Sequence, residues 1–443
     1  MGGDIMKRLI ESKLLEWKNK VDRKPLIVYG ARQVGKSHTL LEFGKNNYGN
    51  VAYFFFENNE NLKAIFNRSI DSIPKLFMEL SQLVGQTILP QSTLIIFDEI
   101  QACPAAISTL KRINETANEY HVVCAGSLLG LAIHRDAQYS YPVGKVDLLN
   151  MYPMNFREFL MALGSDELIT MIEESYRYDK ELNSAMHELA LEFYRTYLVV
   201  GGMPECVLEY IKRSDFDFVK AKQLAICEIY TNDMVKYCTR TEAMRNIASY
   251  NSVVAQLAKE NKKFQYSLIQ SGARSKDYAD ALFWLEKASI VIRVSKTKEG
   301  KMPLAGYEDL LSFKIFFSDV GLFSAKSNLA PISILTQNFG AEVKGALTEN
   351  YVAAELVASE IRPYYWESQG VAELDFVIQQ GDSIIPIETK SGLNTKSKSL
   401  DAFRKKYDIK KSIRVSSKNF GFENCIKSVP LYAVWCIGLN NKL

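Results

Sequence analysis

One short stretch near the beginning of the chain limits its possible folds more than any other part of the sequence. Residues 25–41 are PLIVYGARQVGKSHTLL, with a glycine, four variable positions and then Gly-Lys-Ser. The apolar residues 26–29 predict a buried strand, and the glycines let the backbone turn so that successive amide groups face an anion. The residues after the loop predict a helix, whose N-terminal end favours negative charge. This pattern predicts a strand–loop–helix unit that binds phosphate groups.

The residues of this loop have distinct predicted roles. Lys36 is placed to reach the β- and γ-phosphates of ATP, and the Ser37 hydroxyl is a ligand for Mg²⁺. We expect the side chain of His38 on the helix surface rather than in catalysis. The alternative is a glycine-rich turn that holds no ligand, but the strand before it and the helix after it favour the phosphate site. The residues expected to contact the nucleotide are Gly30, Ala31, Arg32, Gln33, Val34, Gly35, Lys36, Ser37 and His38.

A second motif supports the first. The apolar run of residues 92–97 is followed by two carboxylates, Asp98 and Glu99. In phosphate-loop NTPases, the strand beside the loop strand ends in an acid that holds Mg²⁺. We therefore expect Asp98 to hold Mg²⁺ and Glu99 to be the general base that polarises the attacking water. The alternative, an ordinary strand end with two solvated acids, would be favoured if the loop were absent.

Apolar runs and helical segments alternate through the first part of the chain, which predicts a doubly wound parallel sheet. Ligands bind at the carboxyl ends of the strands in such sheets. Gly30, Asp98 and Ser127 all fall at such ends, so one sheet edge is expected to gather them. Ser127 suits a polar sensor near the γ-phosphate, and a helix N-cap is an equally open alternative for it.

A further arginine is expected to stabilise the transition state of phosphoryl transfer. Arg32, Arg112 and Arg135 are all candidates, and nothing in the sequence ranks them. A neighbouring subunit of a homo-oligomer is another possible source of this arginine.

Composition places the chain among ordinary globular proteins. Its 443 residues exceed what one core holds, so two to four domains are expected. No apolar run approaches the length of a membrane span, and residues 1–24 carry charges throughout, unlike a signal peptide. The seven cysteines form no Cys-x-x-Cys pair, so we expect a cytoplasmic protein without a zinc site or a disulfide framework.

The middle of the chain predicts mainly helices. Residues 164–237 are helical in pattern, interrupted by a sharp turn at Gly201-Gly202-Met203-Pro204. Short helices and then two strands, at 290–295 and 313–317, are typical of a winged helix-turn-helix. Its second helix carries acids as well as lysines, which favours a structural or protein-contact role over DNA binding. The expected domains are an ATPase domain (1–160), a helical region (161–245), a winged-helix-like domain (246–330) and a C-terminal domain (331–443).

The C-terminal region contains a predicted hairpin that carries charged residues. With Gly381-Asp382 as a two-residue turn, Asp375 lies opposite Glu388, and Lys390 lies on the same face. The two carboxylates would hold Mg²⁺ and the lysine would orient or deprotonate a water. The alternative is a surface hairpin with an ordinary Glu–Lys pair. Pro386 cannot donate to the ladder, so we expect the strand to be bulged or unpaired there.

Two features surround this hairpin. Glu349 lies on the small and apolar stripe of a long helix predicted over 339–361, and an inward carboxylate requires a partner, for which a metal would serve. From Pro386 to Leu443 the chain has twelve Lys and Arg residues against four Asp and Glu residues. A basic segment of this kind is either a solvated face or a surface that binds a polyanion such as DNA.

Taken together, these motifs resemble one family. The chain looks like the bacterial and archaeal AAA-superfamily ATPases that carry a C-terminal restriction-endonuclease-like domain, so an α/β fold with a P-loop sheet, a helical and winged-helix region and a nuclease-like domain is expected. The resemblance spans nearly the whole chain and lies in residues 30–37, 97–101, 125–127, 152–159, 201–205, 318–322, 347–350, 373–376 and 387–392.

The resemblance implies specific sites. It implies ATP at the loop, Mg²⁺ at Ser37 and Asp98, and a sensor at Ser127. The family often has Gly-Arg where this chain has Gly144-Lys145, and a lysine would be the weaker nucleotide contact. The nuclease-type core that it implies consists of Glu349, Asp375, Glu388 and Lys390.

Two hypotheses about function follow. In the first, an ATPase acts on nucleic acid and its C-terminal domain cuts or grips the strand. In the second, a nucleotide-gated switch binds other proteins through a catalytically inactive nuclease-like domain. A phosphate-loop kinase is disfavoured, because Asp98 and Glu99 suit a water rather than an acceptor hydroxyl.

Overall fold

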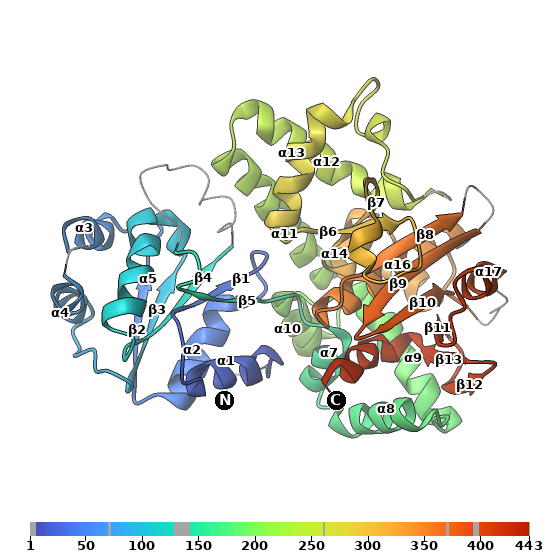
Figure 1. Ribbon diagram of the computed structural model, residues 1–443, viewed down its shortest axis with the longest axis horizontal. Coiled ribbons are helices and arrows are strands. Elements are labelled where there is room, and N and C mark those ends of the chain that lie inside the picture. Colours follow the sequence, from blue (N-terminus) through green and yellow to red (C-terminus); the bar gives the residue numbers. More distant parts are fainter. Residues whose placement is uncertain are drawn as a thin grey trace. The chain divides into compact units, whose positions relative to one another are not determined.

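The computed structural model describes residues 6–69, 72–127, 142–259, 262–368, 372–392 and 398–442. It contains two compact units (Figure 1), which we call unit 1 and unit 2. Unit 1 is Met1–Tyr152 with Lys287–Ser289, and unit 2 is Pro153–Glu286 with Ile290–Leu443. The finer division at residues 160, 245 and 330 stays a prediction. In the described part of the chain, none of the helices combines the length and the apolar character needed to cross a bilayer.

Unit 1 is built on a five-stranded sheet in which every pairing is parallel, in the order β2-β3-β4-β1-β5. Its strands are β1 (Leu26–Tyr29), β2 (Asn50–Phe55), β3 (Thr93–Asp98), β4 (His121–Gly126) and β5 (Asp147–Asn150). Its helices are α1 (Ile10–Asn19), α2 (Lys36–Asn47), α3 (Glu60–Ser69), α4 (Ile73–Val84), the 3-10 turn η1 (Ile100–Ala102) and α5 (Pro104–Thr116).

Helices cover both faces of this sheet (Figure 1), which confirms the predicted P-loop α/β arrangement. Neighbouring strand residues point to opposite faces. Ile95 belongs to the core formed with α3, α4 and α5, whereas Leu94 faces Gly44 of α2. The central strands β3 and β4 are therefore buried on both sides, which explains why they are continuous apolar runs rather than alternating ones.

One expectation about this sheet was wrong. We expected the strand that ends in Asp98 to lie beside the loop strand, but β4 separates β3 from β1. The β1–β4 and β3–β4 pairs are both parallel, with Val123 opposite Leu26 on one side and Ile96 on the other. Apart from His121, β4 has no polar side chain and every residue of it is buried, so it fills a central position of the sheet, and its carboxyl end lies between the other two.

Unit 2 contains the remaining helices and an eight-stranded mixed sheet. The helices are α7 (Phe156–Ala162), α8 (Asp166–Tyr178), α9 (Ser184–Val200), α10 (Pro204–Arg213), α11 (Phe216–Tyr237), α12 (Arg240–Leu257), α13 (Ser275–Lys287), α14 (Val320–Lys326), α15 (Pro331–Leu335), α16 (Ala341–Ala358) and α17 (Lys398–Tyr407), with 3-10 turns η2 (Tyr266–Leu268), η3 (Leu304–Tyr307) and η4 (Leu431–Lys442). The strands are β6 (Val291–Thr297), β7 (Glu308–Phe317), β8 (Tyr364–Ser368), β9 (Ala372–Gln380), β10 (Ser383–Thr389), β11 (Ser412–Ser416), β12 (Gly421–Glu423) and β13 (Ile426–Pro430).

The two strands expected to form the wing of a separate module are part of this large sheet. β6 and β7 pair antiparallel, as a wing would, but β6 also pairs in parallel with β8 through Ser295–Tyr364. The sheet order is β12-β13-β11-β10-β9-β8-β6-β7, so β7 is an edge strand of the C-terminal sheet. The expectation of a free-standing wing is therefore corrected. A pattern of two strands does not specify what a third strand, far along the chain, will pair with.

The predicted hairpin of β9 and β10 has the expected register. Gln380 lies opposite Ser383 and Phe376 lies opposite Ile387, on either side of the Gly381-Asp382 turn. The pairing continues through Pro386 and Val377 without a bulge, which corrects our expectation for this proline. Counting from the turn, Pro386 falls at a position where antiparallel partners exchange no hydrogen bond. The parallel pairing of β10 with β11 begins only at Ile387, so the missing N–H is tolerated there.

A close backbone junction lies at the turn between α9 and α10. The N–H of Gly202 donates to Asp319 Oδ2 at 2.6 Å, and the Gly202 carbonyl accepts from the N–H of Met154 at 2.7 Å. A Cβ at position 202 would lie 1.8 Å from the Met154 carbonyl oxygen, so only glycine fits. Burial raises the pKa of Asp319 to about 6, against the hydrogen bonds that lower it. The sharp turn predicted at Gly201-Gly202-Met203-Pro204 is thus a packing feature of unit 2.

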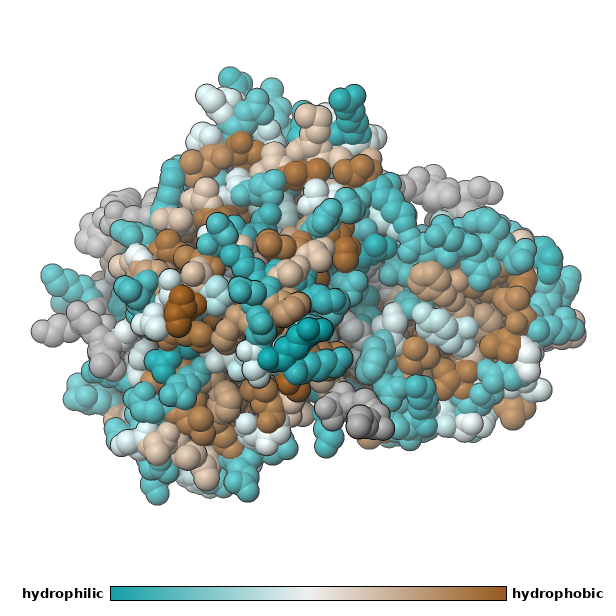
Figure 2. Space-filling model, turned by 180° about the vertical axis from the view of Figure 1, so that it is seen from behind, coloured by the Kyte–Doolittle hydropathy of each residue, from teal (hydrophilic) through white to brown (hydrophobic). Residues whose placement is uncertain are grey.

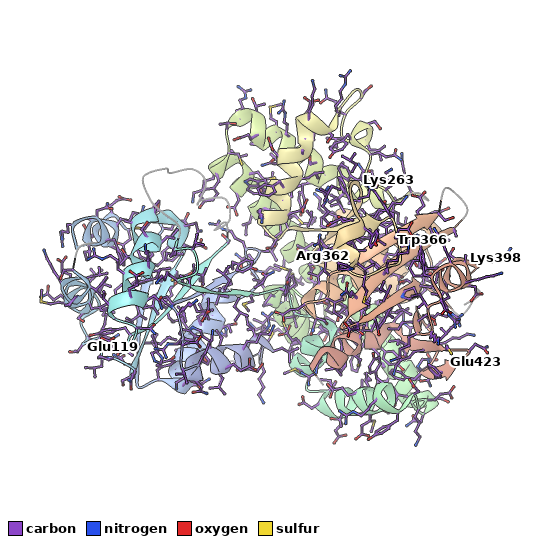
Figure 3. The ribbon with its side chains drawn as sticks, viewed as in Figure 1. Glu119, Lys263, Arg362, Trp366, Lys398 and Glu423 are labelled. Atoms are coloured by element: carbon purple, nitrogen blue, oxygen red, sulfur yellow. The ribbon has the colours of Figure 1, made fainter. Side chains whose placement is uncertain are left out.

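The face of the molecule seen in Figure 2 carries hydrophilic side chains with groups of apolar side chains between them, as is common on globular proteins. In unit 2, the buried Trp366 of β8 packs against Phe403 of α17, with their ring centroids 5.1 Å apart. Lys398, labelled with Trp366 in Figure 3, begins that helix. The basic last turn of α17 is therefore held on the sheet by aromatic packing.

Candidate functional site

The phosphate loop of unit 1 is bent as the motif requires. It connects β1 to α2, and Gln33 and Gly35 both have left-handed backbone conformations, with φ values of 67° and 93°. Gly30 lies so close to the backbone of Met151, just after β5, that a Cβ would be 2.1 Å from the Met151 carbonyl oxygen. These conformations turn the loop back on itself before the helix begins, which is how backbone amides come to face one anion.

Lys36 is folded into this loop. Its side chain is 7% exposed, and its Nζ donates to the carbonyl oxygens of Gly30 at 2.9 Å and Ala31 at 2.7 Å. Burial lowers the pKa of Lys36 to about 8, although the carboxylates of Glu99 and Asp98 act to raise it. Its hydrogen bonds to these loop carbonyls are weaker than those it would form with charged phosphate oxygens. Lys36 is therefore placed to bind phosphate.

Asp98 ends β3 in a setting that suits a carboxylate. It is 3% exposed, and it accepts hydrogen bonds from the Tyr53 hydroxyl at 2.6 Å and from the N–H of Glu99 at 3.0 Å. Burial, followed by the hydrogen bond to Asp98, raises the pKa of Tyr53, so the tyrosine stays a donor. Together with Ser37 at the start of α2, Asp98 supplies oxygen ligands of the kind that Mg²⁺ prefers.

Glu99 follows with a left-handed backbone, at a φ of 51°. Its Oε2 accepts a hydrogen bond from Nε2 of Gln101, which lies in the η1 turn. Gln101 is buried, and in the described part of the chain its Oε1 has no hydrogen-bond partner. Gln101 lies within the motif at residues 97–101, from which no separate role for it was predicted. The structure shows that it holds the predicted general base.

Ser127 directly follows β4, between the ends of β1 and β3, and it is buried. Its Oγ accepts from Nε of Arg32 at 3.4 Å, and the guanidinium of Arg32 lies 3.7 Å from Glu57 Oε2. The structure therefore brings the loop, Asp98, Glu99 and Ser127 to one edge of the sheet. Glu57 was not anticipated, because nothing in its local sequence marks it.

The other predicted residues of unit 1 lie elsewhere. His38 is exposed on α2, and Arg112 lies on α5. Arg135 falls outside the described residues. Lys145, which replaces the arginine common in the resembled family, forms an ion pair with Glu115 at 2.9 Å.

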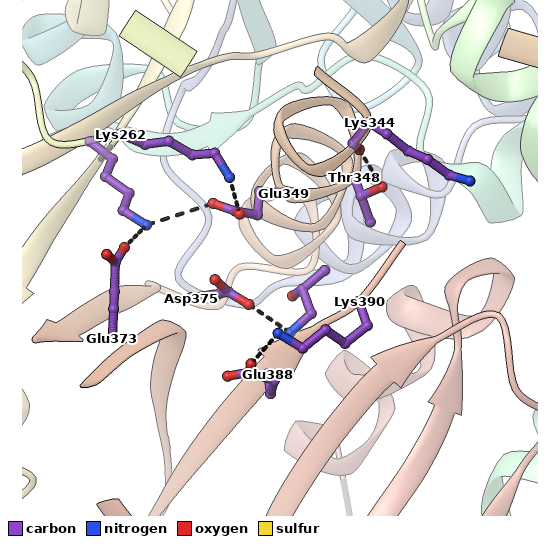
Figure 4. A network of polar contacts seen from close by, with 10 residues as sticks. Lys262, Lys344, Thr348, Glu349, Glu373, Asp375, Glu388 and Lys390 are labelled. Atoms are coloured by element: carbon purple, nitrogen blue, oxygen red, sulfur yellow. Dashed lines mark hydrogen bonds and ion pairs between the residues drawn. The ribbon is translucent and has the colours of Figure 1, made fainter. Parts of the chain in front are cut away.

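Unit 2 contains a second group of charged side chains, between α16 and the sheet (Figure 4). Glu349 of α16 pairs with Lys262 through Oε1 and with Lys314 of β7 at 3.6 Å through Oε2. Lys314 also pairs with Glu373 of β9 at 2.5 Å, and its side chain is only 2% exposed. We expected a metal as the partner of the inward-facing Glu349, but its partners here are two lysines.

The predicted hairpin pair lies beside this group (Figure 4). Asp375 Oδ2 accepts from the N–H of Thr389 at 2.8 Å, and Lys390 Nζ lies 2.6 Å from Glu388 Oε1. Glu388 is buried, and its Oε2 has no hydrogen-bond partner in the described part of the chain. The expected convergence of Asp375, Glu388 and Lys390 on one face is thus present in the structure.

The charges of this cluster shift one another's pKa values in opposite directions. Burial, and then the carboxylates of Glu349 and Glu388, raise the pKa of Asp375 well above its usual range. Burial would also raise the pKa of Glu349, but Lys314 and Lys262 bring it below its ordinary value. Burial would lower the pKa of Lys314, yet the surrounding carboxylates raise it. Glu349 and Lys314 are therefore a charged pair, whereas burial and the neighbouring carboxylates favour the protonated form of Asp375.

The cluster fits a metal ion only in part. Among the described residues, no three His, Cys, Asp or Glu side chains form a group that could hold a metal. Asp375 and Glu388 supply two carboxylates, and the unsatisfied Oε2 of Glu388 suits a cation. Lys262, Lys314 and Glu373 were not predicted as site residues. For Lys314 the sequence contains an indication, because a lysine inside the apolar run Phe313–Phe317 is unusual.

Several solved structures align with most of this chain, at low sequence identity and low TM-scores. The Walker-type ATPase of Pyrococcus abyssi is 14% identical, with a TM-score of 0.42, and the alignment covers 73% of this chain and 96% of that chain. The ORC1 protein of Aeropyrum pernix in complex with DNA is 11% identical, with a TM-score of 0.29 and coverage of 75% and 95%. The ORC2 protein of the same organism in its ADP form is 14% identical, with a TM-score of 0.29 and coverage of 78% and 95%. The search of curated proteins gave no match.

Family models match three segments of the chain. Two of them, domains of unknown function named DUF8612 and DUF4143, match residues 191–333 and 344–434. The third is described as an AAA domain and matches residues 22–160, which include β1 to β5 and the phosphate loop. Residues 22–160, with the phosphate loop between β1 and α2, therefore match the model of an AAA domain.

Proposed function

We propose that unit 1 binds ATP with Mg²⁺ and hydrolyses it. The observation that carries this proposal is the buried Lys36, whose ammonium is held by the loop carbonyls of Gly30 and Ala31. The β- and γ-phosphates would replace these carbonyls as its partners. Ser37 and Asp98 would hold the Mg²⁺, which when bound neutralises charge on the phosphate oxygens.

In this proposal Glu99 removes a proton from the attacking water. The Ser127 hydroxyl donates a hydrogen bond to an oxygen of the γ-phosphate. Gln101 keeps the carboxylate of Glu99 in place through its hydrogen bond to Oε2. Because β4 lies between β1 and β3, the sensor Ser127 falls between the phosphate loop and the general base.

Two variants test the ATPase. Lys36→Ala should abolish the heat of ATP binding in calorimetry, because the buried cation at the phosphates is lost. Glu99→Gln should keep ATP binding within about threefold but lower kcat by about 100-fold or more, the range for loss of a general base. Unchanged turnover by Glu99→Gln would remove Glu99 from this role, and no ATP binding by the wild type would remove the function itself.

For unit 2 we propose metal-dependent hydrolysis of a nucleic-acid phosphodiester at Asp375, Glu388 and Lys390. The support is the hairpin register together with the pairing of Lys390 and Glu388 at 2.6 Å. The two carboxylates would hold Mg²⁺ or Mn²⁺, and Lys390 would orient the attacking water. The alternative is a nucleotide-gated switch in which this cluster only stabilises unit 2, which the pairing of Glu349 with two lysines favours.

A cleavage assay separates these two functions. Plasmid DNA is incubated with the protein, ATP and Mg²⁺ or Mn²⁺, beside a Lys390→Ala variant. Cleavage by the wild type that is lost in the variant supports the nuclease. The absence of both cleavage and salt-dependent DNA binding in the wild type supports the switch.

A further inference from the structure

Arg32 is part of the phosphate loop, but its side chain reaches the ends of two other strands. Its Nε donates to Ser127 Oγ at 3.4 Å, and its guanidinium lies 3.7 Å from Glu57 Oε2. Ser127 directly follows β4, and Glu57 lies just after β2. Arg32 and Glu57 are 20% and 22% exposed, so this charged pair is largely shielded from water. One arginine thus links the loop to the two strand ends that flank Asp98.

The position of a bound γ-phosphate follows from the neighbouring groups. Lys36 reaches the last two phosphates, and Glu99 must reach a water on the far side of the γ-phosphorus. Lys36 follows the loop after β1, Glu99 follows β3, and β4 lies between these two strands. Ser127, just after the end of β4, therefore lies next to the space between Lys36 and Glu99. A cation that touches the Ser127 hydroxyl is therefore beside the γ-phosphate.

We propose that Arg32 is the arginine that stabilises the transition state of ATP hydrolysis, supplied by the same chain that binds the nucleotide. Before ATP binds, Glu57 and Ser127 hold its guanidinium at the site. With ATP present, the planar guanidinium donates to oxygens of the γ-phosphate, where negative charge develops. This inference rests on the ATPase function proposed above.

The reaction that Arg32 would assist is balanced as follows. The water oxygen forms a bond to the γ-phosphorus while the bond from the γ-phosphorus to the β–γ bridging oxygen breaks. Glu99 accepts the proton of the water, and the bridging oxygen leaves with the electron pair as part of ADP. Inorganic phosphate is the second product. Arg32 forms no covalent bond and acts only through charge and hydrogen bonds.

Arg112 was also a candidate for this role, but its position is less suitable. Arg112 lies eight residues after Pro104, the first residue of α5. At 1.5 Å per residue, it is about 12 Å along the helix from the end that lies next to Glu99 and η1. Arg112 therefore serves as the control for Arg32.

The test compares Arg32→Ala with Arg112→Ala in the full chain. Arg32→Ala should lower kcat by about 100-fold or more, because an arginine at this step contributes at least that much in related chemistry. Its affinity for ADP should stay within about threefold, since ADP lacks the γ-phosphate. Arg32→Lys should fall between wild type and Arg32→Ala, because it keeps the charge but not the planar fork. Arg112→Ala should leave kcat unchanged.

Three results would overturn the inference. The first is a kcat of Arg32→Ala within threefold of the wild type, and the second is an equal loss of ADP and ATP binding, which would make Arg32 a general binding residue. The third is recovery of activity when Arg32→Ala is mixed with Glu99→Gln, which would show that the arginine acts across subunits. Arg32→Gln, which keeps a donor for Ser127, replaces Arg32→Ala if that variant does not fold. A wild type that binds no ATP would instead refute the ATPase function.

Discussion

At the scale of single residues, the state of Lys36 depends on its surroundings. Its ammonium is buried, and burial lowers its pKa to about 8. The nearby Asp98 and Glu99 offset part of this effect, so the group is still mainly charged at neutral pH. Bound phosphates would add negative charge and raise the pKa again. ATP binding and protonation of Lys36 are therefore linked.

This linkage predicts a pH dependence of ATP affinity. Because the free-state pKa is lowered to about 8, the charge is present below pH 8 and is lost as the pH rises through that value. The affinity for ATP should thus fall by only about twofold from pH 7 to pH 8 and then by up to about tenfold per pH unit. Calorimetry between pH 7 and 10 measures it. Lys36→Arg is the control, since its guanidinium keeps its charge, and a flat profile for the wild type would contradict the prediction.

The buried ion pairs of unit 2 also join residues that are far apart in the sequence. Lys314 lies in the apolar strand β7 and pairs with Glu349 and Glu373, which are far from it in the sequence. Such a lysine is tolerated only because these carboxylates replace its lost hydration. The sequence shows the unusual lysine but not its partners, which is why the partner of Glu349 was expected to be a metal.

At the scale of secondary-structure elements, the junction at Gly202 joins segments that are distant in the chain. Its N–H is held by Asp319, which also caps α14 through the N–H of Leu322 at 2.9 Å. Its carbonyl accepts from Met154, whose own carbonyl accepts from the Tyr197 hydroxyl at 2.6 Å. Three of the motifs that define the family resemblance therefore meet at this junction and serve the packing of unit 2.

Gly202→Ala should destabilise the protein strongly. The added Cβ would lie 1.8 Å from the Met154 carbonyl oxygen, so the backbone must move. We expect the free energy of unfolding to fall by about 3 kcal/mol or more, as for severe overpacking. Urea denaturation followed by circular dichroism measures the change. Gly421→Ala is the matched control, because none of the residues that the structure describes places an atom within 4 Å of the added Cβ, and similar losses for both variants would refute the argument.

At the scale of the whole molecule, the charge is distributed unevenly. The net charge is only +3, although the segment from Pro386 onward is strongly basic. In α17 the basic residues gather in the last turn, at Arg404, Lys405 and Lys406. Lys405 and Lys406 are exposed, so they are available to a polyanion. This surface is where the proposed action on nucleic acid predicts a contact.

Reversal of these charges tests that contact. The Lys405→Glu/Lys406→Glu variant should weaken binding of duplex DNA by about tenfold or more. It should also reduce the slope of log affinity against log salt concentration by about two, one for each lost phosphate contact. Fluorescence anisotropy at several salt concentrations measures both quantities. Lys212→Glu/Arg213→Glu, in the last turn of α10, is the matched control, and equal effects of the two variants would contradict a specific contact.

The sequence alone determined the features that depend on short stretches of chain. The phosphate loop, the strand that ends in Asp98 and the β9–β10 hairpin are each specified by residues that are near one another, because turn geometry and side-chain periodicity are local properties. The hairpin register, with Gln380 opposite Ser383, followed from the turn alone.

Which of these elements become neighbours depends on long-range contacts, which are visible in the folded molecule but not in any one segment of the sequence. The position of β4 between β1 and β3, the pairing of β6 with β8, and the lysines that surround Glu349 all join residues far apart in the sequence. Such choices follow from which strand buries the most apolar surface and which charges must be compensated in the interior. They depend on the whole chain at once, so no single segment contains them.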